Sequence, residues 1–184
     1  CDGVGEGETM SAFTIDEDCK IKKIWTNYYP NSLGLFYSTI TDFLGFEVNE
    51  GEFKVMSLSS FGKPLYVNEF KKILNTDNSK LDIEYFEFHK NSNKSFSKKL
   101  IDIIDQPYLN IDLDSNFQKY ADIACSAQII LEETMENIIR NILKISDKKK
   151  IVLTGGVALN CKMIHSLSKL DLFDELIRFI FNKV

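Results

Sequence analysis

The longest run of helical periodicity covers residues 115–144. Its apolar positions recur every three or four residues and form one continuous stripe, with acidic side chains on the opposite face. The stripe consists of Ile123, Ala127, Ile130, Leu131, Met135, Ile138 and Ile142. Ser115 followed by Gln118 fits a capping box, so the pattern predicts a helix roughly 40 Å long that begins near Ser115. Small residues near this start, at 121, 124, 126 and 127, would let a second backbone pack closely.

A second amphipathic helix is predicted after Pro30. Ser32 is a suitable N-cap, apolar residues follow at spacings of three and four, and Gly45 provides the C-cap. The apolar residues are Leu33, Phe36, Tyr37, Ile40, Phe43 and Leu44. Short helices are also predicted at 67–74 and 100–104. The aromatic-rich segment 81–89 is interpreted as a strand or extended segment.

Short strands are predicted at the N-terminal end of the chain. Segments 10–15 and 20–25 are extended and joined by a turn at Glu17-Asp18, and the Gly-rich acidic residues 2–9 are typical of a turn that follows an earlier strand. The pattern indicates an antiparallel meander at the edge of a sheet.

The segment Ile151–Asn160 combines a short apolar strand, the turn Thr154-Gly155-Gly156 and the predicted start of a helix at 157–163. Two glycines let the backbone approach a phosphate, and the N-terminus of the following helix offers free N–H donors. A tight turn that binds nothing fits the local pattern equally well, because a lone Gly-Gly is a weak motif. The long helix, the strand and the Gly-Gly turn together predict an α/β unit with a ligand crevice at the end of the strand.

Composition and charge narrow the function classes. The net charge of −5 argues against non-specific nucleic-acid binding, and the basic run at 148–150 fits a solvated loop. None of the four cysteines, at 1, 19, 125 and 161, forms a CxxC-type pair. Cys125 and Cys161 lie among small apolar residues and are predicted to be buried free thiols of a cytoplasmic protein. The sequence shows no membrane-spanning run and no signal peptide.

Several polar residues are candidates for chemistry. Asp2 and Glu6 lie beside flexible glycines, where carboxylates could hold a cation, although Asp-Gly is also common in plain turns. Lys63 could neutralise a phosphate or remain a surface lysine. His89 and His165 lack a partner at helical spacing, so neither indicates a metal site.

Five segments, taken in their order along the chain, form a pattern that none of them forms alone. They are DGVGE at 2–6, PNSLGLFYSTITDFLGF at 30–46, GEFKVMSLSSFGKP at 51–64, YADIACSAQ at 120–128 with LEE at 131–133, and TGGVALNC at 154–161. In this order they resemble the carbamoyltransferases of the nodulation-protein type over most of residues 1 to about 175.

This resemblance implies a fold and a reaction. The family has an α/β fold, the duplicated ribonuclease-H-like core shared by actin, sugar kinases and heat-shock chaperones. A C-terminal YrdC-like domain makes carbamoyl adenylate from carbamoyl phosphate and ATP. The domain similar to this chain transfers the carbamoyl group to a hydroxyl of a small acceptor, usually a sugar or natural product. A divalent metal of the iron type is bound in the family by an HxxxH motif and aspartates.

The resemblance also assigns site residues. Asp2 would be a metal ligand. Gly155 and Gly156 would approach the nucleotide phosphate, with Asn160 supporting the loop. Glu52 and Lys54 lie in a motif that lines the site. The family's catalytic histidine would lie outside the chain, so no catalytic residue is assigned.

The chain departs from the family pattern at both ends. The HxxxH motif would precede Asp2, the last metal-binding Asp would follow the chain's end, and residues 175–184 read as an apolar basic tail where the family has a strand. Gly7 replaces a frequent Trp, and Ser59-Ser60-Phe61 replaces Ala-Pro-Tyr. We therefore expect a fragment of the N-terminal domain, truncated at both ends and inactive alone.

The expected fragment has three parts and no YrdC-like domain. They are a β-meander at about 1–28, an insertion-like α+β region at 30–110, and the long helix, strand and Gly-Gly loop at 115–165. Two alternatives are a truncated non-catalytic nucleotide-binding or scaffold protein and an enzyme of the tRNA threonylcarbamoyl-adenosine type. The second lacks support from a basic face or from the pattern at 51–64. The acceptor and the oligomeric state stay open.

Overall fold

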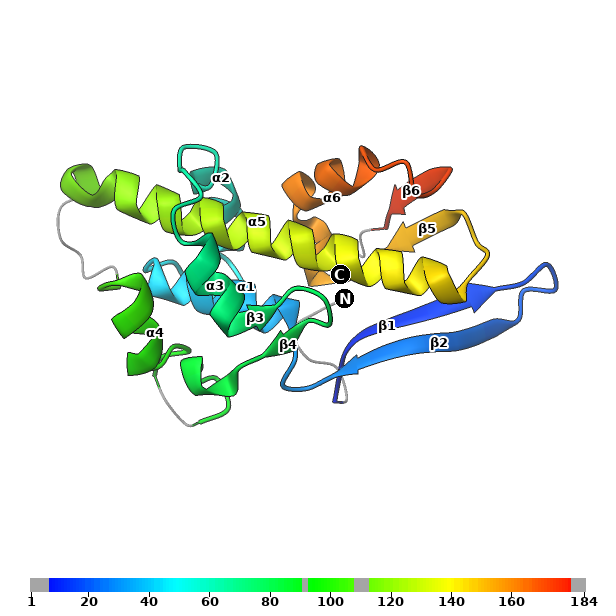
Figure 1. Cartoon of the computed structure of the whole chain (residues 1–184), viewed down its shortest axis with the longest axis horizontal. Helices are drawn as coiled ribbons and strands as arrows, with labels where there is room; N and C mark the ends of the chain where they lie inside the picture. Colours follow the sequence, from blue (N-terminus) through cyan, green and yellow to red (C-terminus); the bar gives the residue numbers. More distant parts are fainter. Residues whose placement is uncertain (1–6, 91–92, 108–112, 180–184) are drawn as a thin grey trace.

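The computed structural model of the chain describes residues 7–90, 93–107 and 113–179 (Figure 1). The helix α5 (Leu113–Ile145) is the central element, and four shorter helices pack along it. These helices are α1 (Leu33–Phe43), α2 (Glu52–Leu58), α3 (Val67–Ile73) and α6 (Cys161–Ser168). The fold is of the α/β class, as predicted, with small sheets beside the helices.

The predicted long helix is confirmed and its predicted start is wrong. α5 has 33 residues and begins before Ser115, so Ser115 is not its N-cap. The Gln118 side-chain nitrogen donates to the Phe61 carbonyl at 3.2 Å and to the Asp122 carboxylate at 2.7 Å.

The predicted close packing against the small residues of α5 is confirmed at Gly62. A Cβ atom placed on Gly62 would lie 1.9 Å from the carbonyl oxygen of Ala121, so only a glycine fits against this part of the helix. The backbone N–H of Lys63 donates to Asp122 at 2.7 Å, and that of Tyr66 donates to Ser126 at 2.9 Å. Segment 62–66 is thereby fixed along α5.

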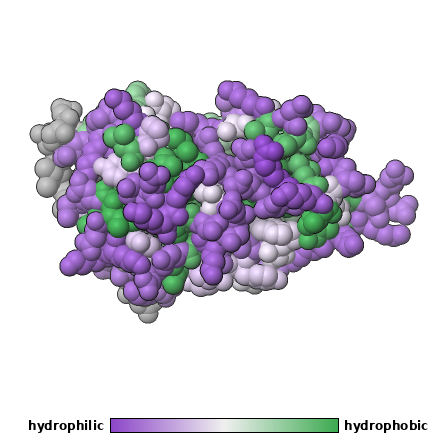
Figure 2. All heavy atoms as spheres, viewed as in Figure 1, coloured by the Kyte–Doolittle hydropathy of each residue, from purple (hydrophilic) through white to green (hydrophobic). Residues whose placement is uncertain are grey.

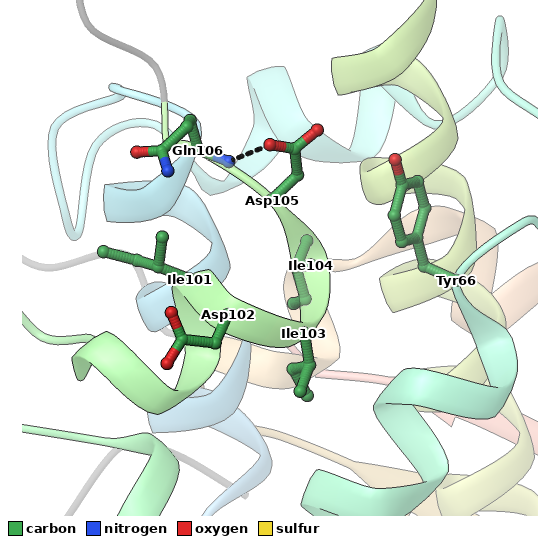
Figure 3. Close-up of a pocket in the computed structure, with 7 residues that line it drawn as sticks. All are labelled: Tyr66, Ile101, Asp102, Ile103, Ile104, Asp105 and Gln106. Atoms are coloured by element: carbon green, nitrogen blue, oxygen red, sulfur yellow. Dashed lines mark hydrogen bonds between the residues drawn. The ribbon is translucent and has the colours of Figure 1, made fainter.

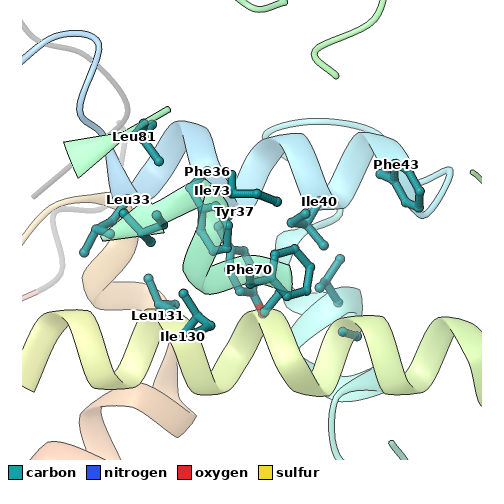
Figure 4. Close-up of a cluster of buried hydrophobic side chains, with 14 of the residues drawn as sticks. Leu33, Phe36, Tyr37, Ile40, Phe43, Phe70, Ile73, Leu81, Ile130 and Leu131 are labelled. Atoms are coloured by element: carbon teal, nitrogen blue, oxygen red, sulfur yellow. The ribbon is translucent and has the colours of Figure 1, made fainter. Parts of the chain in front are cut away.

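The core lies between α1, α3 and α5 (Figure 4). The predicted helix at α1 is confirmed: the Ser32 hydroxyl accepts from the Leu35 N–H at 3.1 Å, and Gly45, with φ of +76°, follows its last turn. Phe36 and Phe70 are both fully buried and meet edge to face at 5.8 Å between ring centres. The predicted aromatic stripe is therefore a packing surface.

The N-terminal strands form an antiparallel hairpin of β1 (Glu8–Ile15) and β2 (Ile21–Tyr28). The turn between them includes Glu17-Asp18, as predicted, and Cys19 there has a φ of +60°. The strand predicted at 20–25 continues to Tyr28. Residues 1–6, which contain most of the predicted Gly-rich turn, lie outside the described residues.

The middle of the chain differs most from the prediction. Residues expected to form a polar turn and a mixed segment form α2 (Glu52–Leu58). The segment 81–89, interpreted as a strand or extended segment, is extended only in part, and Phe86 forms an isolated antiparallel bridge with Phe96. This segment contains the end of β4 (Lys80–Leu81), which pairs with β3 (Leu74–Asn75), and then the 3-10 helix η1 (Ile83–Tyr85). The short helices predicted at 67–74 and 100–104 are confirmed as α3 and α4 (Lys98–Ile104).

Local capping explains why helical turns form in these two segments. The Asp82 carboxylate accepts the Glu84 N–H at 3.1 Å and caps the N-terminus of η1. The Glu52 carboxylate accepts the Asn49 N–H at 2.9 Å and lies in the first turn of α2, where a negative charge stabilises a helix.

The C-terminal part is a strand–helix–strand unit. β5 (Lys150–Leu153) leads through the 3-10 helix η2 (Gly156–Leu159) and α6 to β6 (Glu175–Arg178), which pairs with β5 in parallel. The reading of residues 175–184 as a tail is therefore wrong for 175–178. The helix expected at 157–163 is divided into η2 and α6.

No helix within the described ranges is long and apolar enough to cross a membrane. Polar side chains cover most of the face shown in Figure 2, with separate apolar patches between them.

Candidate functional site

The Gly-Gly turn connects β5 to η2 at the surface of the molecule. Gly155 has a φ of +97°, which side chains other than glycine rarely adopt, and Thr154 and Gly156 are exposed. Ala158 donates its N–H to the Gly155 carbonyl at 3.0 Å. The first N–H groups of the 3-10 helix, at Gly156 and Val157, have no acceptor within that helix, as at every helix start. The turn therefore offers a backbone donor at the exposed Gly156.

Asn160 fixes the end of this turn. Its N–H donates to the Val157 carbonyl at 3.1 Å, and its side-chain oxygen accepts the Met163 N–H at 3.0 Å as the N-cap of α6. The same side chain pairs with Gln128 of α5 through two hydrogen bonds, at 2.8 and 3.0 Å. Asn160 thus joins the turn, α6 and α5, while its predicted support of a bound nucleotide stays a prediction.

Gln128 belongs to a buried polar network that the sequence did not reveal. It accepts the Tyr37 hydroxyl at 2.8 Å and donates to the Glu132 carboxylate at 2.6 Å. Burial raises the pKa of Tyr37 well above its ordinary value of 10.0, and the nearby Glu132 and Glu52 carboxylates raise it further. Tyr37 therefore remains a neutral hydrogen-bond donor to Gln128 at physiological pH.

Glu52 and Lys54, predicted to line the site, both lie on α2. The Glu52 carboxylate accepts the Ser38 hydroxyl at 2.8 Å, in addition to the Asn49 N–H, and so ties α2 to α1. The exposed Lys54 ammonium lies over the rings of Phe46 and Phe53 at 5.8 and 5.9 Å. No hydrogen bond or ion pair links either residue to the Gly-Gly turn within the described residues, and their place in the site stays a prediction.

A lysine on α6 provides a cationic group close in sequence to the turn. The Lys162 ammonium donates to the hydroxyls of Ser59 at 2.7 Å and Ser60 at 3.3 Å, at the end of α2. These serines are the positions at which the sequence departs from the family's Ala-Pro. Lys162 was missed because its partners are 103 and 102 residues away in the chain.

The cysteines beside the site differ from one another in exposure. Cys125 is half-buried, and burial raises the pKa of its thiol. Cys161 was predicted to be buried and is exposed, because it occupies the first position of α6 at the surface. Its sulfur lies 3.6 Å from that of Met56.

A hollow in the surface is lined by none of these groups. It has a volume of about 400 Å³ and is lined by Tyr66 and residues 101–106 of α4 and the following segment (Figure 3). Asp105 lies at its edge, and hydrogen bonds from the Gln106 N–H and Lys119 lower the pKa of its carboxyl. None of the predicted site residues lines this hollow.

The predicted metal site can be examined only in part. Asp2 lies outside the described residues, as does Glu6. Among residues 7–90, 93–107 and 113–179, no three His, Cys, Asp or Glu side chains are grouped so that they could bind a metal ion. His89 and His165 are both exposed. The described residues therefore do not form a donor set for the iron-type metal that the resemblance implies.

The sequence of this chain is similar to that of a known protein family and of several proteins. The family described as "Carbamoyltransferase N-terminus" matches residues 1–182. An uncharacterized protein of Synechocystis, sll1178, is 32% identical over 164 residues, which cover 87% of this chain and 26% of that protein. Nodulation protein NolO of Bradyrhizobium diazoefficiens is 28% identical over 151 residues, which cover 79% of this chain and 25% of NolO.

A relative from an archaeon extends the comparison. The uncharacterized protein MJ1051 of Methanocaldococcus jannaschii is 30% identical over 181 residues, which cover 94% of this chain and 32% of MJ1051. The chain thus spans between a quarter and a third of the length of these three relatives. With the family match extending over residues 1–182, the chain belongs to the carbamoyltransferase N-terminus family.

Proposed function

We propose that this chain is part of an O-carbamoyltransferase and that its Gly-Gly turn binds the phosphate of carbamoyl adenylate. The observation that carries the proposal is the geometry of this turn in a member of the family. Gly155 adopts a φ of +97° immediately before the exposed Gly156, whose N–H begins η2. Backbone N–H groups at a helix start favour a phosphate, and glycine leaves room for its close approach.

The reaction we propose is transfer of the carbamoyl group to a hydroxyl of a small acceptor, such as a sugar or natural product. The acceptor oxygen forms a bond to the carbamoyl carbon, and the bond from that carbon to the adenylate phosphate oxygen breaks. AMP leaves with the bonding electron pair, and the hydroxyl proton passes to a base. Donors at the turn would stabilise the negative charge that grows on the phosphate oxygens as AMP leaves.

The proposed role of the chain within a longer protein follows the family. We propose that its strand–helix–strand unit belongs to an actin-like, ribonuclease-H-like N-terminal domain, and that carbamoyl adenylate is made from ATP and carbamoyl phosphate in a separate YrdC-like domain. The parallel pairing of β5 and β6 across α6 supports this topology. Because the described residues form no donor set for a metal, we derive no step through one.

Phosphate binding can be tested on the 184-residue chain itself by recording ¹H–¹⁵N spectra during titration with AMP. We expect the amide resonances of Gly155, Gly156 and Val157 to shift progressively and saturably. Adenosine is the matched ligand control, because it lacks the phosphate and should leave these amides unchanged.

A variant provides the matched protein control. Gly156→Val places a branched side chain where the phosphate would lie, so AMP should no longer shift the amides of the turn, while resonances of the α1 and α3 core remain in place. AMP shifts that occur only outside residues 154–160, or that persist in Gly156→Val, would show that the turn is merely a connection.

A further inference from the structure

The side-chain amides of Gln128 and Asn160 form a closed pair in the interior of the protein. Gln128 donates to the Asn160 oxygen at 3.0 Å and accepts from the Asn160 nitrogen at 2.8 Å. Gln128 is 2% exposed and Asn160 is 9% exposed. The two residues are 32 positions apart, on α5 and at the end of the Gly-Gly turn. The pair therefore connects the central helix directly to the predicted phosphate site.

Neighbouring groups fix the orientation of both amides. The Gln128 oxygen also accepts from Tyr37, and its nitrogen also donates to Glu132. The Asn160 oxygen also accepts the Met163 N–H. If either amide rotated, a carbonyl oxygen would face an acceptor, or an NH₂ group a donor. Such mismatches are costly in the interior, so only one arrangement satisfies the network.

The Gly-Gly turn and this amide pair meet at Asn160. Thr154 and Gly156, in the first part of the turn, are exposed. At its other end, Val157 and Ala158 are buried and the Asn160 N–H closes η2 by donating to Val157. The first N–H groups of η2 thus belong to a short element that ends at Asn160, whose side chain is bound to Gln128.

We propose that Gln128 is a positioning residue that orients the Gly-Gly turn for phosphate binding without touching the ligand. This inference rests on the proposed function of the turn. It adds a requirement that no turn residue reveals: the phosphate donors are aligned by a glutamine on the central helix. A purely stabilising network would instead affect unfolding and leave the turn of the folded protein unchanged.

The main variant is Gln128→Met, which keeps a side chain of similar length and removes both hydrogen bonds to Asn160, together with those to Tyr37 and Glu132. We expect the Gly155 and Gly156 amide resonances to move even without ligand, and the Kd for AMP to rise about tenfold, which corresponds to about 1.4 kcal/mol. Both measurements are made well below the melting temperature of the variant. The matched control is Thr134→Val on the same helix, because the fully buried Thr134 donates only to the Ile130 carbonyl within α5, at 2.7 Å.

A second variant separates the amide pair from the helix cap. Asn160→Asp keeps an oxygen for the Met163 N–H and for the Gln128 nitrogen, and Asp is a good N-cap. It replaces the nitrogen that donates to the Gln128 oxygen by a carboxylate oxygen, so two acceptors face each other in the pair. We expect the Gly155 and Gly156 amide resonances to move, with the α6 resonances retained.

The outcomes distinguish this inference from the proposed function. Unchanged Gly155 and Gly156 resonances in folded Gln128→Met, or changes as large in Thr134→Val, would overturn the positioning role. If the unaltered chain shows no response to AMP, the proposed function fails. The ligand-free spectra of the variants would still report whether Gln128 orients the turn.

Discussion

Replacing Gly62 by alanine is the substitution for which the structure predicts the clearest loss of stability. An added Cβ would lie 1.9 Å from the Ala121 carbonyl oxygen, 2.2 Å from its carbonyl carbon and 2.7 Å from the Asp122 nitrogen. All three atoms belong to the backbone of α5, which cannot rotate away as a side chain could. Segment 62–66 must therefore move outward from the helix.

The cost can be estimated from what this movement breaks. Overpacking alone costs about 1–3 kcal/mol. The Lys63 N–H bond to the Asp122 carboxylate and the Tyr66 N–H bond to the Ser126 hydroxyl, at 2.7 and 2.9 Å, would stretch or break, at about 1–2 kcal/mol each. Alanine also stabilises the folded state by about 0.4–1 kcal/mol, because it reduces the conformational entropy of the unfolded chain. The net loss is roughly 2–7 kcal/mol, with a centre of about 4 kcal/mol, a large part of the 5–15 kcal/mol typical of a domain.

Urea unfolding followed by circular dichroism measures this loss. With a slope of about 2 kcal/mol per molar urea, the midpoint of Gly62→Ala should fall by about 2 M. The double variant Gly62→Ala/Ala121→Gly identifies the clashing atoms. Because the contact is with the backbone of Ala121, removing its methyl group should not restore stability, and should add about 1 kcal/mol of helix cost.

Two results would refute this reasoning. A midpoint for Gly62→Ala within experimental error of the unaltered protein would show that the segment is not held against α5. Recovery of stability in the double variant would show that the contact involves the Ala121 side chain rather than its carbonyl group.

Two further predictions concern ionisable groups. Because the folded state raises the pKa of Tyr37, the stability that its neutral hydroxyl contributes is fully present below pH 10 and is lost as the pH rises further. The stability advantage of the unaltered protein over Tyr37→Phe in urea unfolding should thus be constant at neutral pH and shrink by about 1.4 kcal/mol per unit above pH 10; a constant difference up to pH 11.5 would contradict the buried neutral phenol. Burial also raises the pKa of the Cys125 thiol, so timed alkylation with iodoacetamide at pH 8, followed by mass spectrometry, should modify Cys125 more slowly than the exposed Cys19 and Cys161. Equal rates would show that Cys125 is accessible as a thiolate.

Elements with many periodic positions were predictable from the sequence. The stripe along α5 and the one along α1 are long enough for their helical period to outweigh local exceptions. The boundaries depended on single capping groups, and the capping box predicted at Ser115 was wrong because α5 begins at Leu113. Short elements of the middle region followed caps such as Asp82, which periodicity does not report.

Non-local pairing explains the error at the C-terminal end. Glu175–Arg178 contains both charged and apolar residues and reads as a tail when taken alone. It becomes a strand because Leu176 and Ile177 pair with Ile151 and Val152 of β5. A strand of four residues has little signal of its own, so its partner determines it.

The candidate site was predictable only where its chemistry is local. The two glycines of the turn are adjacent in the sequence. Gly155 has a positive φ, a backbone conformation that only glycine adopts readily. Asn160 pairs with Gln128 of α5, 32 residues away, and Lys162 with the serines just after α2, more than 100 residues away. These partners are a glutamine and two serines, residue types that do not by themselves predict a contact with Asn160 or Lys162.

The polar residues of α5 show what an amphipathic reading overlooks. Asp122 and Ser126, four residues apart on one side of the helix, are almost fully buried and hold segment 62–66. Gln128 follows by two residues, which turns its side chain about 200° away from Ser126 around the axis and towards the Gly-Gly turn. Dividing the helix into an apolar face and a solvent face would predict that these polar side chains are exposed to solvent. Because a buried polar group must be satisfied, each of them instead marks a place where another backbone or side chain meets the helix.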